Sequence, residues 1–248
     1  MAILVTRPQP DTDTTAAALR ARGFEALPAP MLRFAPVAFR HEADVRFAAV
    51  IVTSANAVRA VADQPQLSSW RPMPLFAVGA RTAAAAREAG FANVISADGD
   101  ADALRDLLAA SLRGKRPSAA QPLLYLAGAD LARDLAAELA PLGLHVTTLT
   151  TYRMAAVTEL PAAVIAAFAG GGIEAVLHYS RRSARAFVAA ARLAGVEISA
   201  LAIPQCCLSE QVAAVLREAG ATQVTVAARP DENALFAALD RALIPLSR

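Results

Sequence analysis

The 248-residue sequence has only two cysteines, three histidines and no long uninterrupted apolar segment. The cysteines, Cys206 and Cys207, are adjacent and cannot join distant parts of the chain, which is typical of proteins in a reducing cytoplasm. No histidine has a ligand partner at helical spacing, so we expect no metal site. The most apolar run, residues 154–172, contains Glu159 and Pro161, and this pattern does not fit a membrane span of about 20 apolar residues.

The numbers of basic and acidic residues, 24 and 22, nearly balance. The net charge of +2 is too small to indicate a nucleic-acid partner. No glycine-rich nucleotide motif follows a strand pattern, since the glycines at 170–172 precede one. We therefore expect neither a cofactor nor a nucleic-acid partner. The first residues read as a strand without a basic leader, which predicts that the protein is not exported but cytoplasmic.

What the sequence does contain is an internal repeat at about half its length. Residues 3–8 lead into a helical pattern that ends at Gly23, and residues 123–128 lead into one that ends at Gly143. We call these two segments A. Residues 48–54 resemble 174–180, and residues 87–90 resemble 217–220; they belong to two longer segments that we call B. Duplicated strand–helix units usually fold as two similar domains that hold a ligand.

Short apolar runs alternate with helical patterns throughout, which predicts an α/β protein with parallel sheets covered by helices. We expect strands over residues 3–6, 25–27, 49–53, 75–78, 93–96, 123–126, 145–149, 175–179, 201–203 and 223–226. We expect helices over residues 13–22, 55–62, 82–89, 100–112, 131–139, 182–193, 210–219 and 231–243. The segment order A, B, A, B leaves two divisions open. The chain could divide near residue 118, or the middle B and A could form one domain and the chain ends the other.

The candidate functional residues lie at the ends of the predicted strands. In an open parallel sheet, ligands bind beyond the carboxyl ends of the strands. The residues there are small, hydroxylated or cationic, a set that suits carboxylates held by backbone N–H groups, hydroxyls and arginine. The candidates for substrate binding are Arg7, Ser54, Ala55, Asn56, Thr82, Gly128, Ser180, Arg181 and Ser209. Taken singly, each could instead be a helix cap or a solvated arginine.

Tyr152 is the one conspicuous candidate for a general acid. It lies in a segment close to where the two halves of the chain meet. Its phenol could act in catalysis, or its ring could only fill a hinge between the halves. The position alone leaves both interpretations open.

Taken together, these residues resemble the uroporphyrinogen-III synthase family over essentially the whole chain. The order and spacing of several short segments carry the resemblance: residues 5–8, 47–58, 78–83, 102–104, 151–153, 179–183 and 229–235. One departure stands out. Residues 207–213 replace the glycine–threonine turn that the family often has in its second half, and Ser209 could take over the role of that threonine.

The resemblance implies two flavodoxin-like domains joined by a two-stranded linker, with the active site in the cleft between them. It implies domains of residues 1–35 plus 155–248 and of residues 38–150, in a monomer. The implied reaction closes hydroxymethylbilane to uroporphyrinogen III, with inversion of ring D and loss of water. It needs no cofactor, and its substrate carries eight carboxylates.

Under this resemblance, Tyr152 is the expected catalytic residue, because a phenol can give a proton to the departing hydroxyl. The alternative function is a two-domain module that binds an anion or senses it without catalysis.

Overall fold

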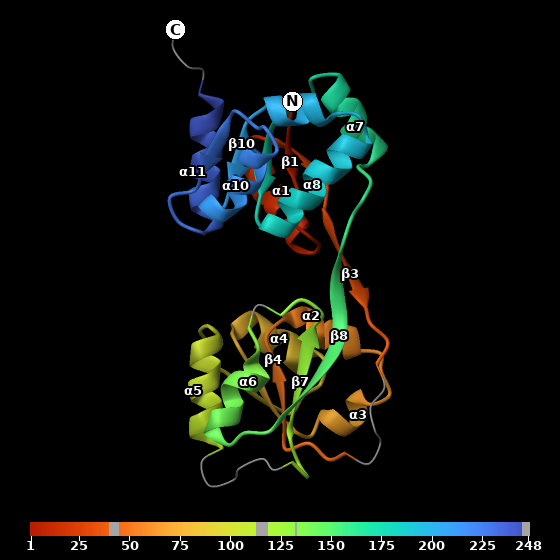
Figure 1. Cartoon of the computed structure of the whole chain (residues 1–248), viewed down its shortest axis with the longest axis vertical. Helices are drawn as coiled ribbons and strands as arrows, with labels where there is room; N and C mark the ends of the chain where they lie inside the picture. Colours follow the sequence, from red (N-terminus) through yellow and green to blue (C-terminus); the bar gives the residue numbers. More distant parts are fainter. Residues whose placement is uncertain (40–44, 113–118, 132, 245–248) are drawn as a thin grey trace. The chain divides into compact units, whose positions relative to one another are not determined.

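The computed structural model describes residues 1–39, 45–112, 119–131 and 133–244. The chain forms two compact units, each built from helices and a largely parallel sheet (Figure 1). Unit 1 contains Met1–Arg33 and Ala155–Arg248, and unit 2 contains Phe34–Met154. The loop at residues 113–118, where a division of the chain was one expectation, lies outside the described residues.

Unit 1 has a five-stranded sheet in the order β11-β10-β9-β1-β2, in which every neighbouring pair is parallel. Its strands are β1 (Ala2–Val5), β2 (Glu25–Pro28), β9 (Ile173–His178), β10 (Gln205–Cys207) and β11 (Val224–Val226). Its helices are α1 (Asp11–Ala21), α7 (Ala162–Ala169), α8 (Arg181–Leu193), α9 (Glu197–Ala202), α10 (Glu210–Glu218) and α11 (Glu232–Leu243).

Unit 2 contains most of a six-stranded sheet in the order β3-β8-β7-β4-β5-β6, parallel from β8 to β6. The strands are β3 (Leu32–Pro36), β4 (Ala49–Val52), β5 (Pro74–Ala77), β6 (Asn93–Ser96), β7 (Leu123–Gly128) and β8 (Val146–Ala156). The helices are α2 (Ala55–Val61), α3 (Leu67–Trp70), α4 (Ala80–Glu88), α5 (Ala101–Ser111), α6 (Leu135–Leu139) and the 3₁₀ turn η1 (Ala140–Leu142). The chain passes between the units twice, within β3 and within β8.

The internal repeat reappears in the pairing of the strands. Leu4 of β1 pairs with Val176 of β9, and Leu124 of β7 pairs with Val50 of β4. These are the same positions of the repeat, 120 and 126 residues apart in the sequence. The sheet orders β2-β1-β9-β10-β11 and β8-β7-β4-β5-β6 are therefore equivalent. Each unit holds one A segment and one B segment, and the A segment comes first in unit 1 and last in unit 2.

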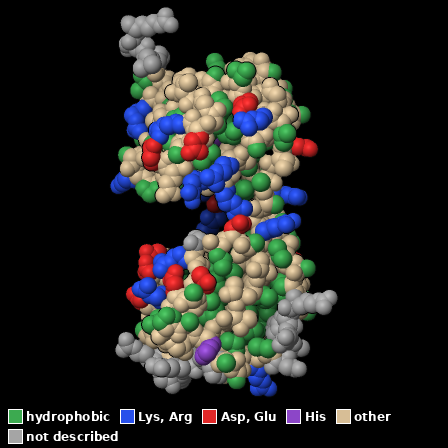
Figure 2. Space-filling model, viewed as in Figure 1, with side chains coloured by type: hydrophobic (Ala, Val, Ile, Leu, Met, Phe, Trp, Pro, Cys, Tyr) green, Lys and Arg blue, Asp and Glu red, His purple; other side chains and the backbone are tan. Residues whose placement is uncertain are grey.

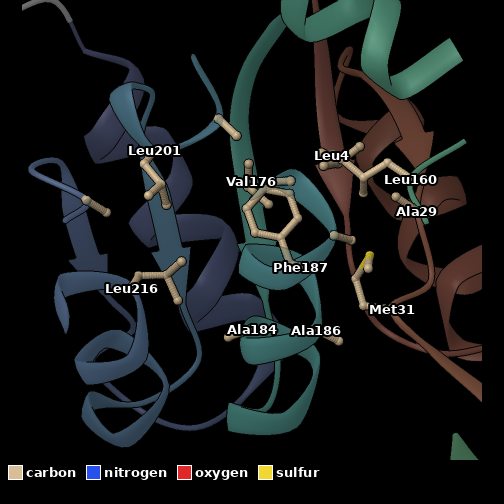
Figure 3. Packing of buried hydrophobic residues seen from close by; sticks show 14 of the residues in the cluster. Leu4, Ala29, Met31, Leu160, Val176, Ala184, Ala186, Phe187, Leu201 and Leu216 are labelled. Atoms are coloured by element: carbon tan, nitrogen blue, oxygen red, sulfur yellow. The ribbon is translucent and has the colours of Figure 1, made fainter. Parts of the chain in front are cut away.

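The central strands are apolar along their whole length because helices cover both faces of each sheet. In β4 all four residues are buried, and in β1 likewise. Figure 3 shows one side of the unit 1 sheet, where Leu4 and Val176 from the strands pack with Phe187 of α8 in one buried cluster. This packing fixes the strands whose ends carry the candidate residues.

Several element boundaries differ from expectation. The predicted strand at 201–203 is wrong, because residues up to Ala202 belong to α9 and the strand is β10, after Pro204. A short apolar run does not distinguish a buried strand from the last turn of a buried helix. The helix expected from residue 131 begins at Leu135, where the Asp134 side chain caps it. Helices α3, α7 and α9 and strand β3 were not predicted.

Local features of the sequence explain several of the helix ends. Gly143 and Gly195 have φ angles of 74° and 71°, a left-handed conformation that glycine adopts readily after a helix. The carboxylate of Asp100 caps α5, and that of Asp231 caps α11. Within the described residues, no helix has both the length and the apolar composition that a membrane crossing requires.

Candidate functional site

A pocket of about 230 Å³ opens in unit 2 beyond the carboxyl ends of β4 and β7. We call it the strand-end pocket. It is lined by hydroxyl-bearing, apolar and charged residues from the strand ends and from α5 and α6. They are Thr53, Ser54, Ala101, Tyr125, Gly128, Asp130, Leu131, Arg133, Leu135 and Tyr152.

Tyr152 reaches this pocket because β8 is irregular. Ala127 pairs with Thr150 but Gly128 pairs with Tyr152, so the register shifts by one residue at Thr151. The extra residue is held in place, since the Thr151 hydroxyl donates to the Ala127 carbonyl and Ala129 N–H donates to the Tyr152 carbonyl. In regular alternation, residues 149 and 152 would face opposite sides of the sheet. Here Leu149 and Tyr152 pack on the same core cluster, so the bulge has redirected Tyr152.

The Tyr152 ring lies directly against Gly128. A Cβ at Gly128 would stand 2.8 Å from Tyr152 Cζ and 3.0 Å from its hydroxyl oxygen. The ring of Phe34 stacks on the ring of Tyr152, with centroids 5.9 Å apart, and the Arg59 guanidinium lies 5.7 Å from the Phe34 ring centroid. Gly128 therefore leaves room for the phenol, and the aromatic neighbour limits its movement.

A second phenol lines the same pocket. Tyr125 is 4% exposed, and its hydroxyl lies 2.9 Å from Thr53 Oγ1. Burial raises the pKa of Tyr125, so it stays protonated and can donate at neutral pH. Sequence reasoning missed Tyr125 because it lies within a continuous apolar strand pattern. Its place near the end of that pattern, shortly before Gly128, was the signal that could have indicated a site.

Charged side chains border the pocket on the side of α5 and α6. Arg133 makes two hydrogen bonds to the Glu138 carboxylate, each of 2.8 Å, and a third of 2.9 Å to Asp102. The Arg133 guanidinium lowers the pKa of Asp102. Figure 2 shows acidic and basic side chains gathered on this side of unit 2. Arg133 lines the pocket, and two carboxylates of its own chain already bind its guanidinium.

The other candidates in unit 2 have different surroundings. Ser54 lines the pocket and caps α2, since its Oγ accepts from the Asn56 N–H. The Asn56 side chain accepts from Arg59, and Ala55 is the first residue of α2. Thr82 lies in α4 with only 6% of its surface exposed. Only three of the candidates, Ser54, Gly128 and Tyr152, come together around the pocket.

Unit 1 has a polar network at the corresponding strand ends. Arg7 donates to Glu232 and to Asp11, at 2.9 Å in each case, and its guanidinium lies 4.4 Å from the centroid of the Tyr179 ring. Thr15 and Tyr179 also donate to the Glu232 carboxylate. We call these five residues the Arg7 network. Arg7 therefore already contacts two carboxylates of its own chain.

The remaining candidates of unit 1 lie at the starts of helices. Ser180 caps α8 by accepting from the Ser183 N–H, and Arg181 is exposed at the first position of that helix. Ser209 precedes α10, and its side chain makes no cap hydrogen bond.

The cysteines are fully buried and unpaired, and burial raises the pKa of each thiol to about 12. Neither thiol is therefore an activated nucleophile. Across the described ranges, no three His, Cys, Asp or Glu side chains lie close enough to hold a metal ion.

A family model described as uroporphyrinogen-III synthase HemD matches residues 13–237. The match covers most of the chain, including the strand-end pocket and Tyr152. The chain belongs to the uroporphyrinogen-III synthase family.

Solved structures of uroporphyrinogen-III synthases have the same fold. The enzyme from Helicobacter pylori 26695 is 15% identical, with a TM-score of 0.64 over 97% of this chain and 98% of the other. A mutant enzyme from the extremely thermophilic bacterium Thermus thermophilus is 17% identical, with a TM-score of 0.53 over 98% of this chain and 99% of the other. Among curated proteins, no sequence matches.

Within this uroporphyrinogen-III synthase family member, the candidate residues form two groups, one at the strand ends of each unit. Unit 1 carries Arg7, Ser180, Arg181 and Ser209, and unit 2 carries Ser54, Ala55, Asn56, Thr82, Gly128 and Tyr152. The residues that sequence reasoning left out of the site are Tyr125, Thr53, Asp130 and Arg133, which line the pocket beside Tyr152.

Proposed function

We propose that this protein is a uroporphyrinogen-III synthase, a hydro-lyase that closes hydroxymethylbilane to uroporphyrinogen III with inversion of ring D. The family match over residues 13–237 is the observation that carries the proposal. The reaction needs a proton for the departing hydroxyl and a substrate held so that closure with inversion is faster than closure without it.

We propose Tyr152 as the proton donor. Tyr152 lines the strand-end pocket, with Gly128 leaving space for its ring and Phe34 stacked on it. A phenol that is held in one place can donate to a leaving hydroxyl without prior reorganisation. This step requires neither a metal nor a cofactor, and we propose that the enzyme uses neither.

The other candidates would hold the carboxylates of the substrate. Arg181 is an exposed cation at the start of α8, and Ser209 has a hydroxyl that does not cap its helix. Arg7 is less suited to direct contact, because Asp11 and Glu232 already bind its guanidinium. We expect Arg7 to support the neighbouring strand ends, with weaker direct contact to the substrate than Arg181.

We further propose that each unit is flavodoxin-like and that β3 and β8 form the two-stranded linker. The strand order of unit 1, in which the second strand of the chain lies at the edge beside the first, follows the 2-1-3-4-5 pattern of flavodoxin-like sheets. We also propose a cytoplasmic monomer. The two buried, unpaired cysteines support a reducing compartment.

The test is a product analysis. Hydroxymethylbilane closes by itself without inversion, to isomer I. When the purified protein is added to freshly made hydroxymethylbilane, the fraction of product that is isomer III should rise with the amount of protein added. If isomer I dominates at every protein concentration, the proposal is wrong. Binding of hydroxymethylbilane without turnover would instead support the anion-binding module.

A further inference from the structure

The two units allow a comparison within the molecule, because equivalent strands pair in the same register. At the strand ends of unit 1, the Glu232 carboxylate accepts three hydrogen bonds at one oxygen. The donors are Arg7 at 2.9 Å, Thr15 at 2.5 Å and Tyr179 at 3.1 Å. In unit 1 this position is therefore occupied by a carboxylate of the protein's own chain, that of Glu232.

The equivalent residues of unit 2 follow from the repeat. Glu232 and Ala101 each come directly after an aspartate that caps the following helix. Tyr179 and Thr53 each come between the last residue of a strand and a serine that caps a helix.

The offset of 120 residues between the two A segments identifies the unit 2 counterparts of two further residues of the Arg7 network. Arg7 corresponds to Ala127, and Thr15 corresponds to Leu135.

Unit 2 therefore lacks the side chains that fill this position in unit 1. An arginine, a tyrosine and a glutamate are replaced by Ala127, Thr53 and Ala101. Of these, Thr53 and Ala101 line the strand-end pocket, together with Leu135. At one position unit 2 has the polar residue and unit 1 the apolar one. Tyr125 corresponds to Val5 of unit 1, and it is a phenol among the residues that line the pocket. The space is retained as an open pocket, and its hydrogen-bond donors belong to different residues.

We infer that the strand-end pocket is a subsite for one carboxylate arm of the substrate, which takes the place that the Glu232 carboxylate has in unit 1. This inference rests on the proposed function. Thr53 and Tyr125 bond to each other at 2.9 Å, which leaves one O–H of the pair to donate to the carboxylate. Arg133 also lines the pocket, where Asp102 and Glu138 hold its guanidinium much as Asp11 and Glu232 hold that of Arg7. Asp130 also lines the pocket and would repel a carboxylate, so we infer that the arm binds at the hydroxyls of Thr53 and Tyr125.

The decisive variant is Ala101→Glu, which gives unit 2 the carboxylate that unit 1 has at this position. Its side chain should occupy the subsite and raise the KM for hydroxymethylbilane at least tenfold. Ala110→Glu is the matched control, because it adds the same charge to an exposed position of the same helix. This control should keep KM within twofold. An Ala101→Glu enzyme that folds and has an unchanged KM overturns the inference.

If Ala101→Glu does not fold, the double variant Thr53→Val and Tyr125→Phe removes the hydroxyl donors with little change in shape. It should raise KM at least fivefold, with a smaller change in kcat, and an unchanged KM again overturns the inference.

A binding measurement separates this inference from the proposed function. The probe is a monopyrrole with one acetate and one propionate arm, followed by NMR, with its dimethyl ester as the comparison. The acid should shift the amide signals of Thr53 and Tyr125 in the wild-type protein but not in Ala101→Glu, and the ester should shift neither. Equal binding of acid and ester would show that the apolar lining drives binding, which contradicts a carboxylate subsite. Acid binding without turnover of hydroxymethylbilane would overturn the proposed function and leave the subsite in place.

Discussion

Tyr152 combines three features at the residue scale: a redirected strand position, a glycine beside its ring and an aromatic neighbour stacked on it. Tyr152→Phe keeps the ring and removes only the hydroxyl. If Tyr152 is the main proton donor, kcat should fall by roughly 10²–10⁴-fold, the usual range for a general acid. We expect the low end of that range, because the pyrrole ring already makes the hydroxyl a good leaving group.

The control is thermal unfolding, which should be unchanged in Tyr152→Phe. Normal turnover combined with a lower melting temperature would show that Tyr152 only packs the linker.

Gly128 provides a second prediction at this scale. In Gly128→Ala, the new Cβ would lie 2.8 Å from Tyr152 Cζ, so the ring must tilt away. Because Phe34 stacks on the ring and limits its movement, we expect some loss of stability and a clear loss of kcat. Gly170→Ala, at the end of α7, is the control, since its Cβ would meet the nearest atom at 3.4 Å. If Gly128→Ala keeps full activity, the contact does not position Tyr152.

The sequence indicates Tyr152 but not the pocket around it. A lone phenol next to the junction of two repeats is visible in the sequence. The bulge at Thr151 is not, because it depends on hydrogen bonds between β7 and β8. Tyr125 was missed for a related reason: an apolar strand pattern describes burial along the strand but does not identify which residue reaches its end.

At the scale of elements, β9 carries a buried titratable group. His178 is fully buried, its Nε2 is 2.9 Å from Gln205 Oε1, and its Nδ1 has no hydrogen-bond partner among the described residues. Burial lowers the pKa of His178 from 6.5 to about 4. The folded protein thus binds a proton less readily than the unfolded chain, so stability decreases as the pH falls from about 6.5 towards 4.

Between pH 7 and pH 5, this histidine should cost about 2 kcal/mol of unfolding free energy, since one pKa unit corresponds to ~1.4 kcal/mol. Urea unfolding at both pH values measures the loss. His178→Gln should reduce the difference between the two pH values, whereas His145→Gln, at an exposed position, should leave it unchanged. Equal pH dependence in wild type and His178→Gln would contradict the assignment.

The prediction of elements was most reliable where local signals agreed. Strands such as β4 and β7 are continuous apolar runs, and helices such as α5 and α11 begin at capping aspartates. Short helices were missed because they lack this combination. Of these, α3 has four residues and no side-chain cap, and α9 has six. Tertiary packing on the sheet, rather than local propensity, stabilises such helices.

At the scale of the whole molecule, the repeat predicts two sheets but leaves open how the four segments combine. In the structure each sheet joins one A segment to one B segment, since β1 neighbours β9 and β4 neighbours β7. These contacts join segments that are more than 70 residues apart in the sequence. Local patterns carry no information about them, which is why the sequence alone left two divisions open.

The last prediction concerns folding of parts of the chain. We propose that residues 34–154, which include the expected domain 38–150, fold cooperatively by themselves, because they contain β4 to β7, most of β8 and the helices that cover them. A fragment of residues 1–118 should not fold. It has β1 without β9 and β4 without β7, so two strands from the sheet centres would expose an unpaired edge. Urea unfolding followed by circular dichroism measures both fragments. A cooperative transition for 1–118 together with none for 34–154 would reverse this assignment and favour a division near residue 118.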